Sequence, residues 1–334
     1  MTSLAALSPR FSRSIRRLRS RALPCLAAAA LLASPSLAEP AAERAFSVRV
    51  IAPQGASEGS GAAARGERRR AVLMIPGLGS PGSVWDEAAR ALVEEGYEAH
   101  LFTLAGFAGE PPVEGEFLPR VRRELAAYAR QLATSGGERA ERPALVGHSL
   151  GATLSLWLGA SEPELFGPIV AVDGVAFLPA LQNPGATVES SREAADGMRG
   201  MLEGMTPEAY DRQTAFTLGT MISDPAVAKR IAEASKGSDP STVARAVHDL
   251  MTRDLRPLLE QVRSPVLMLA AGAAATTEEA TEELIGRYRQ QVAKAPNARV
   301  EMIAGTRHFV MLDAPERFLE LTLEHLEAGA GEGR

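Results

Sequence analysis

One serine in this chain stands in a setting that could make it a nucleophile. Ser149 lies in Gly147-His148-Ser149-Leu150-Gly151, which fits the pattern G-x-S-x-G. The segment 55–59 fits the same pattern, but it lies in a stretch rich in glycine, alanine and serine with no hydrophobic period. Ser149 instead follows the apolar run 144–146 and precedes a helical pattern. This context favours Ser149 over the other match.

A sharp turn from a buried strand into a helix would present the Ser149 hydroxyl for chemistry. The two flanking glycines suit such a turn, because side chains there would collide with the neighbouring strand and helix. The start of the helix would add amide donors and the positive end of the helix dipole. A serine that merely caps a helix is the structural alternative. The pattern predicts nucleophilic attack on a carbonyl carbon.

The rest of the chain alternates between strand-like and helix-like segments, as expected for elements that position such a turn. Strands are predicted at residues 46–51, 71–75, 99–104, 144–146, 168–172, 265–270 and 298–303. Helices are predicted at residues 85–95, 117–133, 150–159 and 315–328. Between about 179 and 259 the chain is predicted to be helical only. This order predicts an α/β fold in which helices flank a mostly parallel sheet, with one domain over 39–334 and a helical cap inserted at 179–259.

The segment 146–152 resembles the nucleophile elbow of the α/β-hydrolase fold, in its lipase, esterase and peroxidase-like branch. The resemblance extends over nearly all of the chain after residue 38. It implies that the loop 75–79 supplies half of the oxyanion hole, with the backbone N–H groups of Leu78 and Leu150 as donors. Many members carry His-Gly in this loop, where this chain has Pro76-Gly77. The donor is a backbone group, so the loss of the histidine need not abolish it.

His308 is the best placed of the five histidines to act as the base. It follows a predicted late strand through the short loop 305–307, and an apolar stretch leads from it to Pro315. This layout resembles the histidine loop of the α/β-hydrolase fold, and it keeps the order serine, acid, histidine. The other histidines lie in the elbow, in a strand pattern and in two helix patterns: His148, His100, His248 and His325.

The acid of the predicted triad is not found at the position that is usual in α/β-hydrolases. Most α/β-hydrolases place an aspartate just after the seventh strand of the fold, but the corresponding segment 271–277 contains no acidic residue. Asp173 ends the sixth strand, an arrangement that resembles a subset of haloalkane dehalogenases. Neighbouring parallel strands end at the same edge of a sheet, so Asp173 could reach the histidine. Glu278 and Glu279 are the alternatives if their loop folds back.

Substrate contacts are predicted from the cap and from one tryptophan. Met198, Met201 and Met205 recur at helical spacing, which suits either a packed cap core or an adaptable apolar lining over the site. Trp85 stands where many α/β-hydrolases carry a tryptophan just downstream of the oxyanion loop. These four residues are the predicted substrate-binding set, and they favour esters of small or medium apolar acids.

The first 38 residues have the three parts of a signal peptide. Six arginines without an acidic residue precede the apolar run 22–33, and Ser36-Leu37-Ala38 provides small residues for cleavage. The apolar run is too short to span a bilayer. We therefore expect an exported protein, periplasmic or secreted, with no stable membrane insertion after the leader is removed.

Composition excludes several function classes. The single cysteine, Cys25, lies in the leader, so the mature chain should have no disulfide and no thiol nucleophile. Without the six leader arginines the chain has 30 basic and 41 acidic residues, a net charge of −11. Such a charge disfavours binding to nucleic acid. Zinc-protease and Walker A motifs are missing, and Gly77-Leu78-Gly79 lacks the third glycine of a dinucleotide fingerprint. We expect no metal and no cofactor.

The prediction is a serine hydrolase that cleaves a small-molecule ester through an acyl-enzyme. Other serine-dependent reactions on the same fold remain alternatives: carbon–carbon bond hydrolysis, amide hydrolysis and acyl transfer. A non-catalytic binding protein is a further alternative, favoured only by the missing acid at 271–277. Nothing in the sequence indicates the oligomeric state.

Overall fold

A computed structural model describes residues 44–53, 70–135 and 141–331. The predicted signal peptide, residues 1–38, and the second serine pattern at 55–59 lie outside these ranges, so the leader and the export route stay predictions. Within the described ranges, no helix combines the length and the apolar character needed to cross a bilayer.

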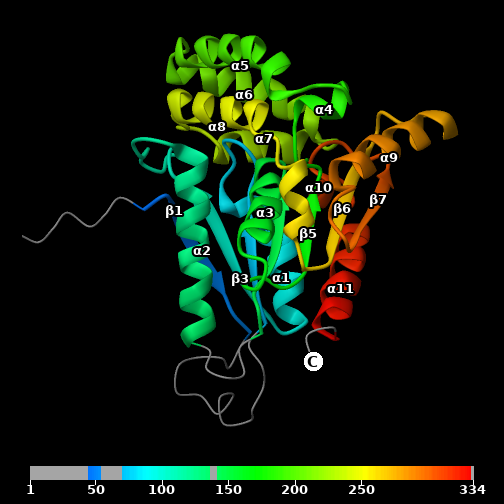
Figure 1. Cartoon of the computed structure of the whole chain (residues 1–334). Coiled ribbons are helices and arrows are strands. Elements are labelled where there is room, and N and C mark those ends of the chain that lie inside the picture. Colours follow the sequence, from blue (N-terminus) through cyan, green and yellow to red (C-terminus); the bar gives the residue numbers. More distant parts are fainter. Residues whose placement is uncertain (1–43, 54–69, 136–140, 332–334) are drawn as a thin grey trace, which may run out of the picture. The chain divides into compact units, whose positions relative to one another are not determined.

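A seven-stranded sheet forms the centre of the fold (Figure 1). Its strands follow the order β1-β3-β2-β4-β5-β6-β7, and only the pairing of β1 with β3 is antiparallel. The strands are β1 (Phe46–Ile51), β2 (Arg70–Ile75), β3 (Tyr97–Leu104), β4 (Ala144–His148), β5 (Ile169–Val172), β6 (Val266–Gly272) and β7 (Ala298–Ala304). The predicted α/β class with a mostly parallel sheet is confirmed.

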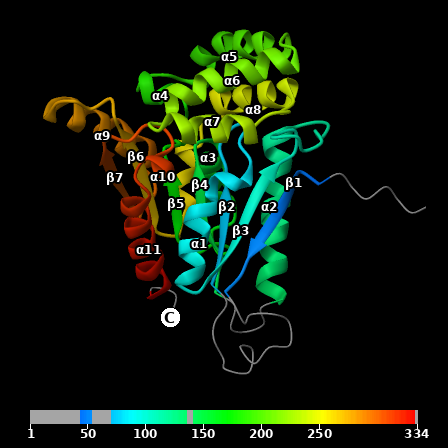
Figure 2. The ribbon, with the colours of Figure 1, turned by 180° about the vertical axis from the view of Figure 1, so that it is seen from behind.

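Helices cover both faces of this sheet (Figures 1 and 2). In β2, Leu73 and Ile75 pack into one hydrophobic cluster, whereas Val72 and Met74 pack into another. This alternation is the reason that a parallel strand reads as a continuous apolar run. The first cluster includes residues of α2 (Phe117–Ser135) and α3 (Leu150–Ser161), and the second includes residues of η2 (Gly82–Trp85), α1 (Asp86–Glu94) and α11 (Pro315–Gly331).

Between β5 and β6 the chain leaves the sheet and forms a run of helices. They are α4 (Pro179–Gln182), α5 (Val188–Glu203), α6 (Pro207–Met221), α7 (Pro225–Ala234), α8 (Pro240–Thr252) and the short η4 (Arg256–Gln261). Helices α5 to α8 gather beyond one end of the sheet in both views (Figures 1 and 2). This helical insertion covers the segment predicted to form the cap.

Local signals explain why the insertion is helical and where its helices begin. Helices α6, α7 and α8 each start with a proline that follows a capping residue, Thr206, Asp224 or Asp239. The cap side chain accepts a hydrogen bond from a free N–H of the first turn, and proline already has the φ that a helix needs.

One helix was not predicted. Helix α9 (Glu278–Val292) lies between β6 and β7, and its sequence has few apolar residues to show a period. Its buried side chains are only Tyr288, Gln291 and Val292. A start signal was present, because Thr277 accepts a hydrogen bond from Ala280 N–H and two glutamates follow it in the first turn. The short α10 (Val310–Asp313) follows β7 and leads into α11.

Candidate active site

Ser149 occupies the turn between β4 and α3 with an unusual backbone. Its φ of 53° and ψ of −116° lie in a region that residues with a side chain rarely enter. The Ser149 N–H donates to Val172 O at 2.8 Å, which ties the turn to the end of β5. The serine side chain is therefore held at the carboxyl edge of the sheet by its neighbouring strand.

The glycines beside Ser149 allow the elbow to pack closely. A Cβ at Gly147 would lie 2.1 Å from Gly151 O, and a Cβ at Gly151 would lie 2.1 Å from Ile75 O. Neither distance is compatible with a side chain, and both obstacles are backbone atoms that cannot swing away. The two glycines let α3 approach β2 and β4, as the sequence pattern predicted.

Asp173 lies next to this turn, at the end of β5. Its Oδ2 is 2.6 Å from Nδ1 of His308, and its side chain is only 9% exposed. Its Oδ1 accepts two hydrogen bonds, from the N–H of Ala271 at 3.0 Å and from the hydroxyl of Tyr288 at 2.5 Å. The end of β6 thus supplies an amide to Asp173, whereas most α/β-hydrolases place the acid itself just after this strand. The strands counted as sixth and seventh in that comparison are β5 and β6 here.

The surroundings keep Asp173 ionised. Burial pushes its pKa up, but the hydrogen bonds from His308, Tyr288 and Ala271 together lower the pKa below its ordinary value. The backbone of Asp173 is also in the left-handed region, with φ of 44°. Its N–H donates to Leu269 O at 2.8 Å, so β6 holds this turn in the way that β5 holds the turn at Ser149.

The structure therefore brings His308 to Asp173 and not to the alternative acids. Glu278 and Glu279 stand exposed in the first turn of α9. His308 lies in the loop between β7 and α10, and its side chain is 25% exposed. Because Asp173 occupies Nδ1, Nε2 is the ring nitrogen without a partner among the described residues. Those residues show no hydrogen bond between Nε2 and the Ser149 hydroxyl, so that contact stays a prediction.

A second histidine supports the loop of His308, a role that no sequence pattern indicated. The Nε2–H of His148 donates to the backbone carbonyl of His308 at 3.0 Å, and the two rings lie 4.6 Å apart. His148 is fully buried. Burial, with a smaller effect from the nearby His308, lowers its pKa to about 3, so this ring is neutral at ordinary pH. A neutral donor can hold the loop without adding a charge beside His308.

The two predicted oxyanion donors have free amides. Leu150 is the first residue of α3, where a helix leaves its N–H groups without partners. Within the described part of the chain, neither Leu78 N–H nor Leu150 N–H donates a hydrogen bond. The loop of Leu78 is close to the elbow, because a Cβ at Gly77 would lie 3.2 Å from Ser149 Cβ. Both groups are thus available to a developing negative charge.

The predicted substrate-binding residues differ widely in their burial. Trp85 is fully buried, with its ring 6.5 Å from that of His148 and 6.1 Å from that of Phe318, so it packs behind the elbow and presents no surface to a ligand. The spacing after the oxyanion loop could not show which way this side chain turns. Met198 and Met201 are 40% and 52% exposed on α5, and Met205 packs against the core. The assignment of Trp85 to substrate contact is therefore wrong, and the role of the three methionines stays a prediction.

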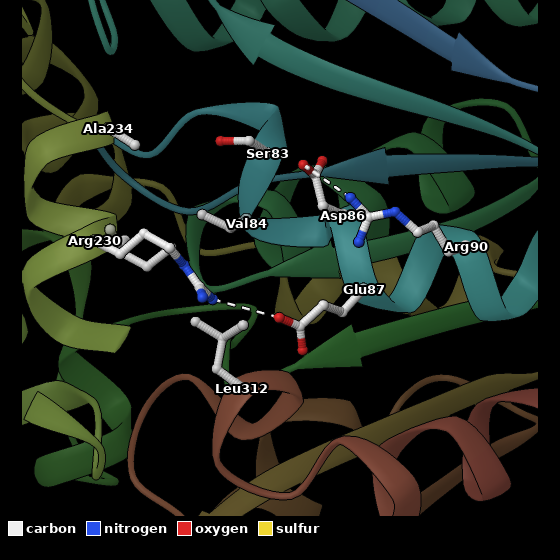
Figure 3. Close-up of a pocket in the computed structure, with 9 residues that line it drawn as sticks. Ser83, Val84, Asp86, Glu87, Arg90, Arg230, Ala234 and Leu312 are labelled. Atoms are coloured by element: carbon white, nitrogen blue, oxygen red, sulfur yellow. Dashed lines mark hydrogen bonds and ion pairs between the residues drawn. The ribbon is translucent and has the colours of Figure 1, made fainter. Parts of the chain in front are cut away.

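A pocket of about 350 Å³ lies elsewhere, between η2, α1, α7 and α10 (Figure 3). None of its lining residues is Ser149, Asp173 or His308. Its charged side chains pair with one another, as Arg230 does with Glu87 at 3.4 Å and Arg90 with Asp86 at 3.9 Å. Among the described residues, no three His, Cys, Asp or Glu side chains come together in a way that could hold a metal ion.

Comparisons with known proteins agree with this fold. A model of the alpha/beta hydrolase family matches residues 72–321. Polyketide synthase ThaQ from Burkholderia thailandensis is 28% identical over 281 residues, which are 79% of this chain and 12% of that protein. A putative carbamate hydrolase, RutD from Escherichia coli, is 32% identical over 103 residues, 31% of this chain and 37% of that protein. The chain therefore spans only a minor part of these relatives.

Solved structures share the fold at low identity. MenH from S. aureus superposes with a TM-score of 0.66 at 14% identity, covering 85% of this chain and 98% of that one. An esterase from Exiguobacterium antarcticum has a TM-score of 0.63 at 15% identity, covering 84% and 95%. An enol-lactonase from Burkholderia xenovorans has a TM-score of 0.58 at 14% identity, covering 84% and 96%.

Proposed function

Because this chain belongs to the alpha/beta hydrolase family, we propose that it hydrolyses carboxylic esters of small or medium apolar acids through an acyl-enzyme on Ser149. The observation that carries the proposal is the 2.6 Å contact between His308 Nδ1 and Asp173 Oδ2 beside the strained Ser149 turn. A buried carboxylate that orients an imidazole, together with a partly exposed serine in such a turn, is the arrangement that can activate a hydroxyl.

In the proposed reaction each residue has one task. His308 Nε2 takes the proton of the Ser149 hydroxyl as the oxygen attacks the ester carbonyl. Asp173 holds the imidazole by Nδ1 and stabilises its protonated form. The N–H groups of Leu78 and Leu150 donate to the oxyanion, and His308 then protonates the departing alcohol. Water activated by His308 releases the acid from the serine.

Two observations support a carbonyl substrate with an apolar acyl group. Leu78, whose amide is a predicted oxyanion donor, is itself a partly buried apolar residue that packs against the core. The esterase, enol-lactonase and carbamate hydrolase similar to this chain are named for groups that all contain an acyl carbonyl. Attack on that carbonyl is the chemistry common to them.

A fluorophosphonate probe tests the nucleophile. We expect the purified wild-type protein to be labelled at Ser149, because the probe reacts with activated serine hydroxyls. Ser149→Ala should remove the label, and mass spectrometry of the labelled peptide locates it. A folded wild-type protein that stays unlabelled would refute the catalytic proposal and favour a binding role.

A series of p-nitrophenyl esters with increasing chain length tests substrate and acid together. Turnover should be highest with short or medium acyl chains, and Asp173→Asn should lower kcat by about 10²–10⁴-fold, because the neutral amide cannot stabilise a protonated imidazole. Glu278→Gln is the matched control and should retain wild-type turnover. If the control loses activity and Asp173→Asn does not, the acid is wrongly assigned.

A further inference from the structure

Tyr288 is the one side chain besides His308 whose hydrogen bond to the Asp173 carboxylate the structure describes. It projects from α9, is 4% exposed, and its hydroxyl lies 2.5 Å from Asp173 Oδ1. The two carboxylate oxygens therefore have different partners. Oδ1 is held by Tyr288 and the Ala271 amide, which leaves Oδ2 for His308.

The hydroxyl of Tyr288 can only act as a donor in this place. Burial, with the negative charge of Asp173 next to it, raises the pKa of Tyr288 far above its ordinary value. The phenol thus stays protonated throughout the range in which an esterase works. A buried hydroxyl also needs a partner, and the carboxylate supplies one.

We propose that Tyr288 is a positioning residue that fixes the Asp173 carboxylate, so that Oδ2 faces His308 Nδ1, and that draws negative charge toward Oδ1. This role rests on the proposed function, since it acts on the same triad. Tyr288 does not touch the reacting atoms. It acts through Asp173, on which the orientation of His308 depends.

The position of Asp173 at the edge of the sheet shows why such a residue is needed. Asp173 has a left-handed backbone and directly follows β5, one strand away from the segment 271–277 where most α/β-hydrolases place the acid. From this position its side chain must reach past the end of β6 to His308. Two donors, one from the end of β6 and one from α9, hold the carboxylate in that extended reach.

Removal of this one hydroxyl should change the protonation of the Asp173–His308 pair. The titratable groups that act on this carboxylate are His308 in its loop, Tyr288 on α9 and His148 on β4. Without the phenol, more negative charge remains on Oδ2, the oxygen that faces His308, so the pair binds its proton more tightly. The acid limb of the kcat/KM profile should move to higher pH, because the base must lose that proton before it acts.

The test compares Tyr288→Phe with Tyr97→Phe. Tyr97 is also buried and hydrogen-bonded, to Arg70, but it stands at the opposite end of its strand from the site. We expect Tyr288→Phe to lower kcat/KM by about 10- to 100-fold and to move the acid limb upward by about half a unit to one unit. Tyr97→Phe should leave both unchanged. Identical profiles for the two variants would overturn the proposal.

Titration of the His308 ring by NMR separates this proposal from the proposed function. The ring signal, assigned by its loss in His308→Gln, should titrate at higher pH in Tyr288→Phe than in wild type, whether or not the protein turns over an ester. A wild type without turnover that still shows this difference would refute the hydrolase assignment and retain the positioning role. An unchanged titration in an active enzyme would overturn the positioning role alone.

Fluorotyrosine at position 288 keeps the test decisive if Tyr288→Phe does not fold. The more acidic phenol retains the shape and donates a stronger hydrogen bond to Asp173. The acid limb and the His308 titration should then move to lower pH, opposite to the expectation for Tyr288→Phe. Failure of both to move would contradict the proposal.

Discussion

Two residues at the site adopt backbone conformations that side chains normally avoid. Ser149 and Asp173 have φ of 53° and 44°, and they directly follow the neighbouring strands β4 and β5. Such strain costs about 1–3 kcal/mol for each residue and persists only where the surroundings impose it. Here the N–H of each residue donates to a backbone carbonyl of the next strand, Val172 in β5 or Leu269 in β6. The sheet thus holds nucleophile and acid in matching turns.

Close packing around the elbow leads to a prediction for Gly151. A Cβ at this position would meet the Ile75 carbonyl at 2.1 Å, so we expect Gly151→Ala to lower the free energy of unfolding by about 2–3 kcal/mol. Gly197→Ala is the matched control in helix α5, with nothing within 4 Å of its new Cβ. It should be neutral or stabilise by up to about 1 kcal/mol. Urea unfolding measures both, and equal stabilities for the two variants would contradict the packing explanation.

At the scale of elements, the helical insertion is tied directly to the loop that carries His308. The carboxylate of Asp313 in α10 accepts hydrogen bonds from the N–H and hydroxyl of Ser223, which follows α6, both at 2.8 Å. It also accepts from the N–H of Arg307 at 2.7 Å. The Arg307 guanidinium in turn donates to the carbonyls of Gly219 and Ile222. Residues on both sides of His308 therefore contact the end of α6.

Loss of the Asp313 carboxylate should loosen this connection. Asp313→Ala removes three hydrogen bonds to a charged acceptor, and we expect it to destabilise the fold by about 1–3 kcal/mol. Glu87→Ala is the control, because Glu87 also links the core to the insertion, through its ion pair with Arg230 across the pocket in Figure 3. Both partners of that pair are exposed, so its loss should cost less than about 1 kcal/mol. Denaturant unfolding of both variants measures the two losses of stability. A larger loss in Glu87→Ala than in Asp313→Ala would contradict the prediction.

At the scale of the whole molecule, buried neutral histidines connect stability to pH. Burial lowers the pKa of His325, in α11, to about 4 and the pKa of His148 to about 3. In the unfolded chain both rings should titrate near 6.5. As the pH falls below 6.5, the unfolded state therefore binds protons that the folded state does not, and stability decreases toward acid.

This linkage predicts an acid-sensitive fold with a measurable slope. Between about pH 6 and 4.5, each of the two histidines should remove about 1.4 kcal/mol of unfolding free energy per pH unit. His325→Gln keeps a donor for the Pro265 carbonyl but no longer titrates, so its slope should be smaller than that of wild type by up to about 1.4 kcal/mol per pH unit. Urea unfolding at a series of pH values measures the slopes. The same slope in both proteins would show that His325 does not contribute to the pH dependence of stability.

Much of the fold was predictable from local patterns. The strands read as apolar runs because both faces of a parallel sheet are buried, and most helices read as periodic segments because one side packs on the sheet. Helix α9 was missed because its sequence is mostly polar or charged and only its end is buried. Trp85 was assigned to substrate contact from its spacing, whereas its side chain points into the core, which spacing along the chain does not reveal.

What the sequence determined by itself was the position of the elbow, because the turn at Ser149 depends on adjacent residues: a buried strand, two glycines and a helix start. The tertiary structure decided the partners of the acid. More than a hundred positions separate Asp173 from both Tyr288 and His308. Strand order and register bring the three residues together, because Val172 of β5 lies beside Leu269 of β6. Such contacts depend on which strands pair, and no local pattern encodes that choice.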